Sequence, residues 1–425
     1  MTPGINLQQT LSRTMLAVSD EPQLIYVLLE AHAEGVAQQL PKLPLNLCLV
    51  LDRSSSMRGE RLMQVKEAAA RIVDQLGPDD YFSLVVFNDR ADVVIPAQRA
   101  IKKSDMKAAI AQIEAAGGTE MAQGMALALQ EVQRPFLTRG ISRLILLTDG
   151  RTYGDESRCV EIARRGQSRG IGLTALGIGT EWNEDLLETM TASENSRAQY
   201  IATAQDVVKV FADEVKRLHA IFARQVHLSL ETRPGALIRS LDQVRPFIAP
   251  ITIVEEEERR WAANLGDWPD TGVQGFLIEV VVPVLPVGDH PLLKLTLRYH
   301  LPAANLRDQV REELIRISMR PAAEVTQRVD ATVRHWLERL VAYRLQASAW
   351  QHVAEGRLAE ASERLRMAGT RMLSVGDTAL AHTLQQEATR ILRSGTASEE
   401  GRKRIRFGTR GLIGPVASDE RETGI

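Results

Sequence analysis

The chain has 425 residues, of which 44% are hydrophobic and 25% are charged, and its 52 basic and 54 acidic residues give a net charge of −2. This length allows two or three domains, and the near-neutral charge excludes a general electrostatic preference for nucleic acid or an anionic membrane. The first residues, MTPGINLQQTLSRTM, lack the apolar core of a signal peptide, and no apolar stretch is long enough to span a membrane. We therefore expect a cytoplasmic protein of bacterial type, with no nucleic-acid partner and no membrane span.

The two cysteines, Cys48 and Cys159, lie far apart in the sequence, one in an apolar run and one in a helix-like segment. Isolated cysteines of this kind are typical of a reducing compartment, where they act as small buried side chains with free thiols. A disulfide between them stays open, because sequence spacing alone does not test its geometry.

The first predicted element is a long strand at residues 21–34, EPQLIYVLLEAHAE. From Leu45 to about Ala220, short apolar runs then alternate with longer stretches of helical periodicity, which predicts a doubly wound, mostly parallel sheet with helices on both faces. The expected strands are residues 46–52, 81–87, 91–97, 143–150, 171–179 and 200–203. The expected helices are residues 60–76, 107–116, 122–133, 156–170, 184–192 and 204–223. The strand at 91–97 follows its predecessor after a three-residue polar turn, so it is expected to lie antiparallel at the edge of the sheet.

After this block the sequence becomes rich in β-forming residues and is punctuated by Pro, Gly and Asp, which predicts an antiparallel sandwich. The expected strands are residues 225–232, 236–242, 247–255, 273–284 and 291–300. Residues 311–319 fit a helix or a strand, and the alternation of Ile315, Ile317 and Met319 favours a strand. The early strand at 21–34 has no partner before the α/β block. We therefore expect it to pair with a strand after residue 225, so that the α/β domain is inserted into the sandwich.

The C-terminal part is predicted to be helical, with three stretches at residues 322–356, 357–373 and 377–392 that form a small hairpin or bundle. The last residues are rich in glycine and mixed in charge, which indicates a flexible basic tail. Within it, Ile405 and Phe407 alternate with arginines, so the tail is either a solubilising extension or a docking peptide. A docking peptide would add as a strand to an open sheet edge, on a neighbouring copy or on another protein. The predicted domains are residues 1–42, a strand-contributing N-terminal segment; 43–222, the α/β domain; 223–320, the sandwich; 321–394, the helical bundle; and 395–425, the tail.

At three places in the α/β block, oxygen-bearing side chains lie just after a predicted strand or just before a predicted helix. Asp52, Ser54 and Ser56 form a D-x-S-x-S turn after the first strand, Thr119 follows two glycines before a helix, and Asp149 ends another strand. In a parallel sheet, sites form beyond the carboxyl ends of the strands. An all-oxygen donor set suits a hard divalent cation, above all Mg²⁺, and the lack of His and Cys in these turns argues against zinc.

Each of these residues also has a simpler explanation. Asp52, Ser56 and Thr119 fit helix caps, and Asp149 fits a turn. Asp155 and Glu156 are expected to be charges at a helix N-terminus. We favour the metal site because three independent loops contribute oxygens to one edge of the same sheet.

The arrangement resembles the von Willebrand factor A (VWA) family and its metal-ion-dependent adhesion site. The family's D-x-S-x-S turn, distant Thr and distant Asp are matched in order by Asp52, Ser54, Ser56, Thr119 and Asp149. The resemblance covers about residues 43–220, and Ser55 departs from it where the family often has Gly. It implies a Rossmann-like sheet, Mg²⁺ or Mn²⁺ at those five residues, and docking of a partner's Asp or Glu onto the metal.

The function expected from this resemblance is that of a non-enzymatic, metal-dependent protein–protein interaction module, a scaffold or adaptor. An alternative is an accessory subunit of an AAA+ ATPase machine of the MoxR type, with the helical C-terminus contacting the motor. A Mg²⁺-dependent hydrolase is a third possibility, but the sequence shows no convincing His, Cys or Lys for a base or nucleophile near the metal.

Overall fold

The structure is a computed structural model that describes residues 3–35, 40–135, 137, 139–326 and 328–414. The chain folds into two compact units. One is built from the residues before 41 and from residues 222–411, and the other from residues 41–221 and the segment that begins at Leu412. We describe each unit by itself.

The second unit contains a six-stranded sheet in the order β6-β5-β4-β7-β8-β9. All neighbouring strands are parallel except β6, which is antiparallel to β5 at the edge as the sequence predicts. The strands are β4 (Leu45–Asp52), β5 (Tyr81–Phe87), β6 (Ala91–Arg99), β7 (Ile141–Thr148), β8 (Gly172–Ile178) and β9 (Arg197–Ile201). β4, β5, β7 and β8 are almost entirely buried, which explains their continuous apolar sequences.

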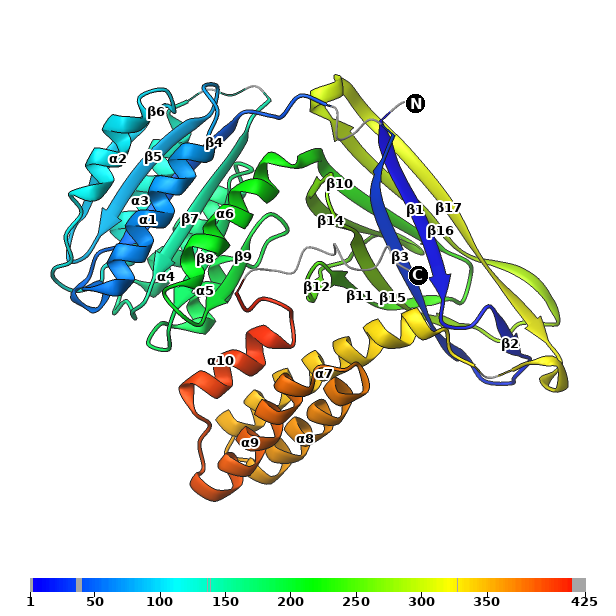
Figure 1. Cartoon of the computed structure of the whole chain (residues 1–425). Coiled ribbons are helices and arrows are strands. Elements are labelled where there is room, and N and C mark those ends of the chain that lie inside the picture. The colour runs from blue at the N-terminus through cyan, green and yellow to red at the C-terminus, as the bar shows by residue number, and fades with distance from the viewer. Residues whose placement is uncertain (1–2, 36–39, 136, 138, 327, 415–425) are drawn as a thin grey trace. The chain divides into compact units, whose positions relative to one another are not determined.

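Helices cover both faces of this sheet, so the doubly wound fold is confirmed (Figure 1). The helices are α1 (Glu60–Gln75), α2 (Lys103–Ala111), α3 (Met121–Gln133), α4 (Glu156–Gln167), α5 (Glu184–Met190) and α6 (Asp206–His219), and a 3₁₀ turn, η2 (Ser55–Met57), precedes α1. α1 packs against α2 and α6, whereas α3 packs against α4. The strand order reverses between β4 and β7, which is where ligands bind in folds of this kind.

Several predicted helix bounds are wrong in this unit: α2 begins at Lys103 instead of 107, α4 ends at Gln167 instead of 170, and both α2 and α6 end early. α2 ends at Ala111, and the residues after it leave the helix because Ala116 donates a backbone hydrogen bond to the Arg53 carbonyl and accepts one from the Asn88 side chain. α6 ends at His219, and the chain enters the next strand at Ile221. In both places tertiary pairing of the backbone overrides a favourable helical sequence.

The first unit contains two sheets that form the predicted sandwich, in the orders β1-β3-β15-β11-β12 and β13-β14-β10-β16-β17-β2. Its strands are β1 (Gly4–Leu11), β2 (Met15–Ala17), β3 (Gln23–Glu34), β10 (Ile221–Thr232), β11 (Leu237–Arg245), β12 (Ala249–Ile251), β13 (Val254–Glu257), β14 (Arg260–Pro269), β15 (Gln274–Val282), β16 (Gly288–Leu301) and β17 (Leu306–Arg320). A single 3₁₀ turn, η3 (Pro302–Ala304), joins β16 to β17.

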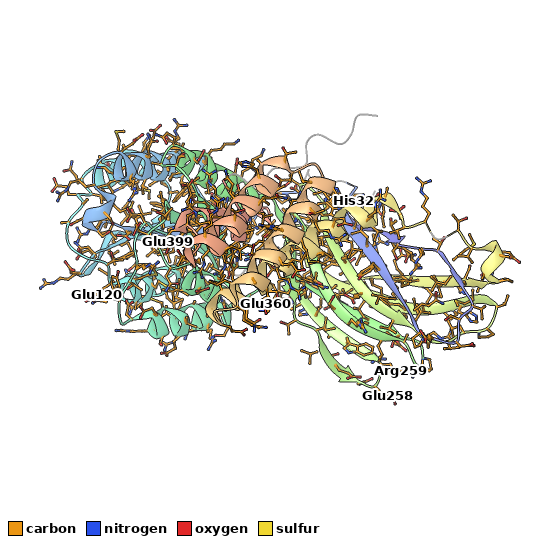
Figure 2. The ribbon with its side chains drawn as sticks, turned by 90° about the horizontal axis from the view of Figure 1, so that it is seen from below. His32, Glu120, Glu258, Arg259, Glu360 and Glu399 are labelled. Carbon is orange, nitrogen blue, oxygen red and sulfur yellow. The ribbon has the colours of Figure 1, made fainter. Side chains whose placement is uncertain are left out.

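The early strand β3 pairs antiparallel with β15, with Leu28 opposite Leu277, so the predicted insertion of the α/β domain into the sandwich is confirmed. β17 confirms the strand expected at residues 311–319. β1, β2 and β14 were not predicted, and β1 is half exposed and carries polar residues. The single strand expected at residues 247–255 is divided between β12 and β13, which lie in different sheets. β13 lies at a sheet edge and is fully exposed, and Figure 2 shows Glu258 and Arg259 at the tip of its hairpin with β14.

The helical region consists of α7 (Ala331–Ala354), α8 (Leu358–Ser374), α9 (Thr378–Ser394) and α10 (Glu399–Gly408), preceded by a 3₁₀ turn, η4 (Ala322–Glu324). α7 begins nine residues later than the predicted 322, because Asp330 accepts hydrogen bonds from the backbone N–H groups of Thr332 and Val333 and so caps the helix. The first half of α7 packs on the sandwich, where Val333 and Leu340 join a cluster with strand residues.

The tail prediction is wrong for the residues that the structure describes. Ile405 and Phe407 are fully buried in α10, not alternating along an extended strand. α10 packs on α9 and α7, and the Ser398 hydroxyl at its start donates a 2.7 Å hydrogen bond to Glu387 of α9. The helical region therefore extends past residue 394, and the apolar residues that suggested docking onto another copy are covered within this chain.

A single β-bridge joins residues 412–414 to β9 within this chain. The Tyr200 N–H donates to the Leu412 carbonyl at 3.0 Å, and the Gly414 N–H donates to the Tyr200 carbonyl at 2.9 Å. Ile413 thus lies parallel to β9 at the open edge of the α/β sheet. Residues 415–425 of the predicted tail lie outside the described residues.

Cys48 and Cys159 are both free and buried, as expected from their isolated positions. Burial raises the pKa of each thiol, so both stay protonated at neutral pH. Among the described helices, none is both long and apolar enough to cross a membrane.

Candidate metal centre

Asp52 is the last residue of β4 and lies at the point where the strand order reverses. Its Oδ1 accepts a 2.8 Å hydrogen bond from the Ser54 backbone N–H, and its Oδ2 accepts a 2.7 Å bond from the Thr148 hydroxyl. Burial raises the pKa of Asp52 to about 6, although hydrogen bonds from Ser54 and Thr148 favour the ionised form, and the neighbouring charge of Asp149 opposes it. Asp52 therefore holds the backbone of the turn through Ser54 and places a buried carboxylate next to it.

The hydroxyls of the D-x-S-x-S turn connect Asp52 to the end of β7. The Ser54 and Ser56 hydroxyl oxygens lie 2.9 Å apart, and the Ser56 hydroxyl donates a 2.6 Å hydrogen bond to Asp149 Oδ1. Asp149 is fully buried, and its other oxygen is 2.5 Å from Nη1 of Arg61 in the first turn of α1. Four of the five predicted ligand residues thus lie in one hydrogen-bonded chain.

Thr119 reaches the same place from the loop before α3. A Cβ atom built on Gly150 would lie 3.5 Å from the Thr119 hydroxyl oxygen and 3.8 Å from that of Ser56. The glycine next to Asp149 therefore leaves space that both hydroxyls border. Thr119 and Ser56 border this space, and hydrogen bonds join the other three predicted residues, Asp52, Ser54 and Asp149, to Ser56.

The two glycines before Thr119 allow its loop to approach Asp89. Gly117 has a φ of +77°, and a Cβ there would lie 2.3 Å from a carboxylate oxygen of Asp89. The Gly118 N–H donates a 2.9 Å hydrogen bond to the same carboxylate, and the Gly117 carbonyl accepts one from the Ser55 N–H. The loop is thus joined directly to the D-x-S-x-S turn, and a side chain at Gly117 would break this contact.

Thr152 and Asp155 also position Thr119, a role that the sequence analysis missed. The Thr152 hydroxyl lies 3.1 Å from the Thr119 carbonyl oxygen and accepts a hydrogen bond from the Met121 N–H, and Asp155 accepts one from Ala122. Asp155 occupies the cap position of α4, but its side chain makes no capping bond to that helix. The only feature of the sequence that pointed to this role was the position of Asp155, three residues after Thr152 in the loop that follows Asp149.

The helix-cap explanation does not hold for the D-x-S-x-S turn or for Thr119. α1 is preceded by Gly59 and α3 by Glu120, and neither helix has a side-chain cap. The side chain of Glu120, labelled in Figure 2, is exposed at the surface of the α/β unit and makes no capping bond to α3.

The donor set of this site is two carboxylates and three hydroxyls, all oxygen. Within the described part of the chain there is no cluster of three or more His, Cys, Asp and Glu side chains that could hold a metal. Hydroxyl-rich sites of this kind fit hard cations that keep some water ligands. The residues present fit Mg²⁺ or Mn²⁺; binding itself stays a prediction.

Comparison with known proteins supports the assignment of the fold. The profile of the von Willebrand factor type A domain matches residues 46–214, and that of the Sll0103-like C-terminal alpha-helical domain matches residues 331–415. The uncharacterized protein sll0103 of Synechocystis sp. is 30% identical over 381 residues, which cover 89% of this chain and 90% of that protein. This chain belongs to the von Willebrand factor A family. The α/β unit is its VWA domain.

Two other similar proteins match either a smaller part of the chain or the whole fold at lower sequence identity. Bovine inter-alpha-trypsin inhibitor heavy chain H1 is 32% identical over 183 residues, which cover 40% of this chain and only 20% of that protein. The solved structure of a von Willebrand factor type A protein from Catenulispora acidiphila superposes with a TM-score of 0.75 at 19% identity, covering 96% of this chain and 97% of that one. This second likeness extends the shared fold beyond the VWA domain to the sandwich and the helices.

Proposed function

We propose that this chain is a non-enzymatic, metal-dependent protein-interaction module that binds a carboxylate of a partner protein through Mg²⁺ or Mn²⁺ at the VWA domain. The observation that carries the proposal is the hydrogen-bonded chain of two carboxylates and two hydroxyls, Asp52, Ser54, Ser56 and Asp149, with the Thr119 hydroxyl beside it across Gly150. VWA domains are commonly interaction modules that depend on a metal, which agrees with this composition.

The residues divide into two roles in this proposal. Ser54, Ser56 and Thr119 would hold the cation through their hydroxyl oxygens, and Asp52 and Asp149 would do so directly or through water. Because the hydroxyl ligands are uncharged, a bound dication would keep enough Lewis acidity to accept a further carboxylate oxygen from outside. The hydrogen bonds on Asp52 and Asp149 come from hydroxyls, a backbone N–H and an arginine. In this proposal the two carboxylates are held in place by these donors, and their role is to hold the cation.

Calorimetric titration with Mn²⁺ and Mg²⁺ tests this proposal. We expect the double variant Ser54→Ala with Thr119→Ala to lose binding, because two neutral oxygen ligands are removed without a change of charge. A matched control is Ser104→Ala with Thr189→Ala, which removes the same atoms from exposed positions of the same domain. Absence of Mn²⁺ binding by the wild type, or equal binding by the Ser54/Thr119 variant, contradicts the proposal.

The alternative role, an accessory subunit of a MoxR-like AAA+ ATPase, uses the same metal chemistry with a different partner. Affinity purification of the full chain, with the Ser54/Thr119 variant in parallel, distinguishes the two. An ATPase recovered in a metal-dependent manner supports the alternative, whereas a carboxylate-presenting protein without ATPase motifs supports the adaptor.

A further inference from the structure

Arg61 is a cation at the edge of the candidate metal centre that the five-residue motif does not include. Its Nη1 lies 2.5 Å from Asp149 Oδ2 and 3.4 Å from the Ser56 carbonyl oxygen. The Asp149 side chain is fully buried, but 38% of the Arg61 side chain is exposed. The guanidinium therefore lies between a buried ligand carboxylate and the solvent.

The surroundings leave part of the guanidinium free to meet another group. Gly179, at the end of β8, has a φ of +66°, and a Cβ built there would lie 3.4 Å from Nη2 of Arg61. A larger residue would crowd that nitrogen. Within the described chain the hydrogen bonds of Arg61 go to Asp149 and Ser56, and both start from Nη1. Arginine has five N–H donors in a planar fork, so donors remain for an incoming carboxylate.

The charges at the site favour an anionic ligand. Asp52 and Asp149 carry −2 when ionised and a dication carries +2, so these groups alone sum to zero. Arg61 adds one positive charge, which a neutral ligand leaves uncompensated and a carboxylate balances. Because Arg61 shares the carboxylate of Asp149, it also reduces the negative charge available to the metal.

We propose that Arg61 makes the site selective for a carboxylate, by weakening metal binding when no carboxylate is present and by offering the incoming carboxylate a second contact beside the metal. This inference rests on the proposed function, since it concerns the same site. It adds that metal and carboxylate bind with positive coupling, and that Arg61 is the specificity-determining residue for the partner's acidic side chain.

The competing explanation is that Arg61 only holds Asp149 in place. In that case its loss would loosen the ligand and weaken metal binding. The two explanations predict opposite signs for the change in metal affinity, so a single titration separates them.

The experiment is Mn²⁺ titration of the full chain in sodium acetate and in sodium chloride at equal ionic strength, with acetate as the carboxylate probe. For the wild type we expect tighter Mn²⁺ binding in acetate. For Arg61→Gln in chloride we expect binding roughly three- to tenfold tighter than wild type, because a nearby positive charge is removed. The ratio of Mn²⁺ affinity in acetate to that in chloride should fall toward one in this variant. Arg61→Lys keeps the charge and loses the fork, so it should bind Mn²⁺ as the wild type does in chloride but gain less from acetate.

The matched control is Arg71→Gln, which removes an arginine of the same helix that is paired with exposed Glu67. It should behave as the wild type in both buffers. Acetate also binds free Mn²⁺, but this effect is the same for every protein, so it cancels when the acetate-to-chloride affinity ratios of two proteins are compared. If Arg61→Gln binds Mn²⁺ as the wild type does, binds it more weakly, or keeps the full acetate gain, the inference is overturned while the proposed function stands. If the wild type itself binds no Mn²⁺, both fail together.

Discussion

The Thr148 hydroxyl donates a 2.7 Å hydrogen bond to Asp52, and both side chains are fully buried. The two residues end neighbouring parallel strands and are 96 positions apart in the sequence. This bond joins the ends of β4 and β7, from which the D-x-S-x-S turn and the Asp149 loop of the candidate metal centre begin. It also favours the ionised form of the Asp52 carboxylate and so opposes burial, which raises the pKa of Asp52.

Replacement of Thr148 by Val keeps the shape of the side chain and removes this bond. We expect the stability of the VWA domain to fall by about 1–3 kcal/mol, because a buried carboxylate loses a hydrogen-bond donor. Amide exchange of β4, measured in EDTA, reports this change for the domain by itself. Thr189→Val, at an exposed position of α5 in the same domain, is the control and should change stability by less than about 0.5 kcal/mol. Equal exchange in both variants contradicts the role given to Thr148.

Glu214 is a buried carboxylate of α6 that joins three other side chains. It pairs with Arg197 and Arg217 and accepts a 2.6 Å hydrogen bond from Thr174. Burial raises the pKa of Glu214, but the two guanidinium charges and the hydrogen bonds outweigh it, and the net pKa is lowered. We expect Glu214→Gln to destabilise the VWA domain by about 3–5 kcal/mol at pH 7, since it leaves a buried guanidinium without its counter-charge.

The same shift fixes the pH dependence of stability. A carboxylate whose pKa is lowered on folding stabilises the native state fully above its unfolded value of 4.5, and this contribution decreases as the pH falls below that value. The melting temperatures of wild type and Glu214→Gln should therefore converge as the pH is lowered from 7 to 3. Glu67→Gln, in the exposed pair with Arg71, should show neither effect. A constant difference between wild type and Glu214→Gln across this range is inconsistent with the prediction.

Ile405 distinguishes a packed C-terminal helix from a flexible tail. It is fully buried in the core of the helical region, with residues of α7, α8 and α9. Ile405→Ala should destabilise this region by about 2–5 kcal/mol, the usual cost of a cavity at a buried aliphatic side chain. Arg404→Ala, at a half-exposed neighbour paired with Glu400, should have little effect. Amide exchange of α9 provides the measurement, and an unchanged rate in Ile405→Ala would show that α10 is not packed there.

The pairing of the C-terminal segment with β9 is testable at one amide. The Tyr200 N–H donates to the Leu412 carbonyl, so a chain that ends at Gly411 loses its acceptor. We expect exchange of this amide to become roughly five- to tenfold faster, because one hydrogen bond contributes about 1 kcal/mol. A chain that ends at Gly414 keeps the segment and should exchange as the full chain does. Equal rates in the two truncated chains would contradict the pairing.

Features that depend on local periodicity and turn chemistry could be predicted from the amino-acid sequence. Continuous apolar runs such as Leu45–Asp52 identify buried parallel strands, and the carboxyl ends of such strands must meet at one edge. This reasoning brings Asp52 and Asp149 together from the sequence, whereas Thr119 joins them through the resemblance to the VWA motif. The pairing of β3 with β15 was also predictable, because an apolar strand of twelve residues needs a partner sheet.

The side chains that support those residues could be identified only from the folded chain. Thr148, Arg61 and Asp155 have no spacing relative to their partners that a local pattern reveals, because each contact joins separate loops or elements. The C-terminal residues show the same limit. Ile405 and Phe407 lie two positions apart, which indicates one face of a strand, yet both are buried in a helix because neighbouring elements cover it on more than one side. Two apolar residues are too few to define a period, so the surfaces available to cover them decide between helix and strand.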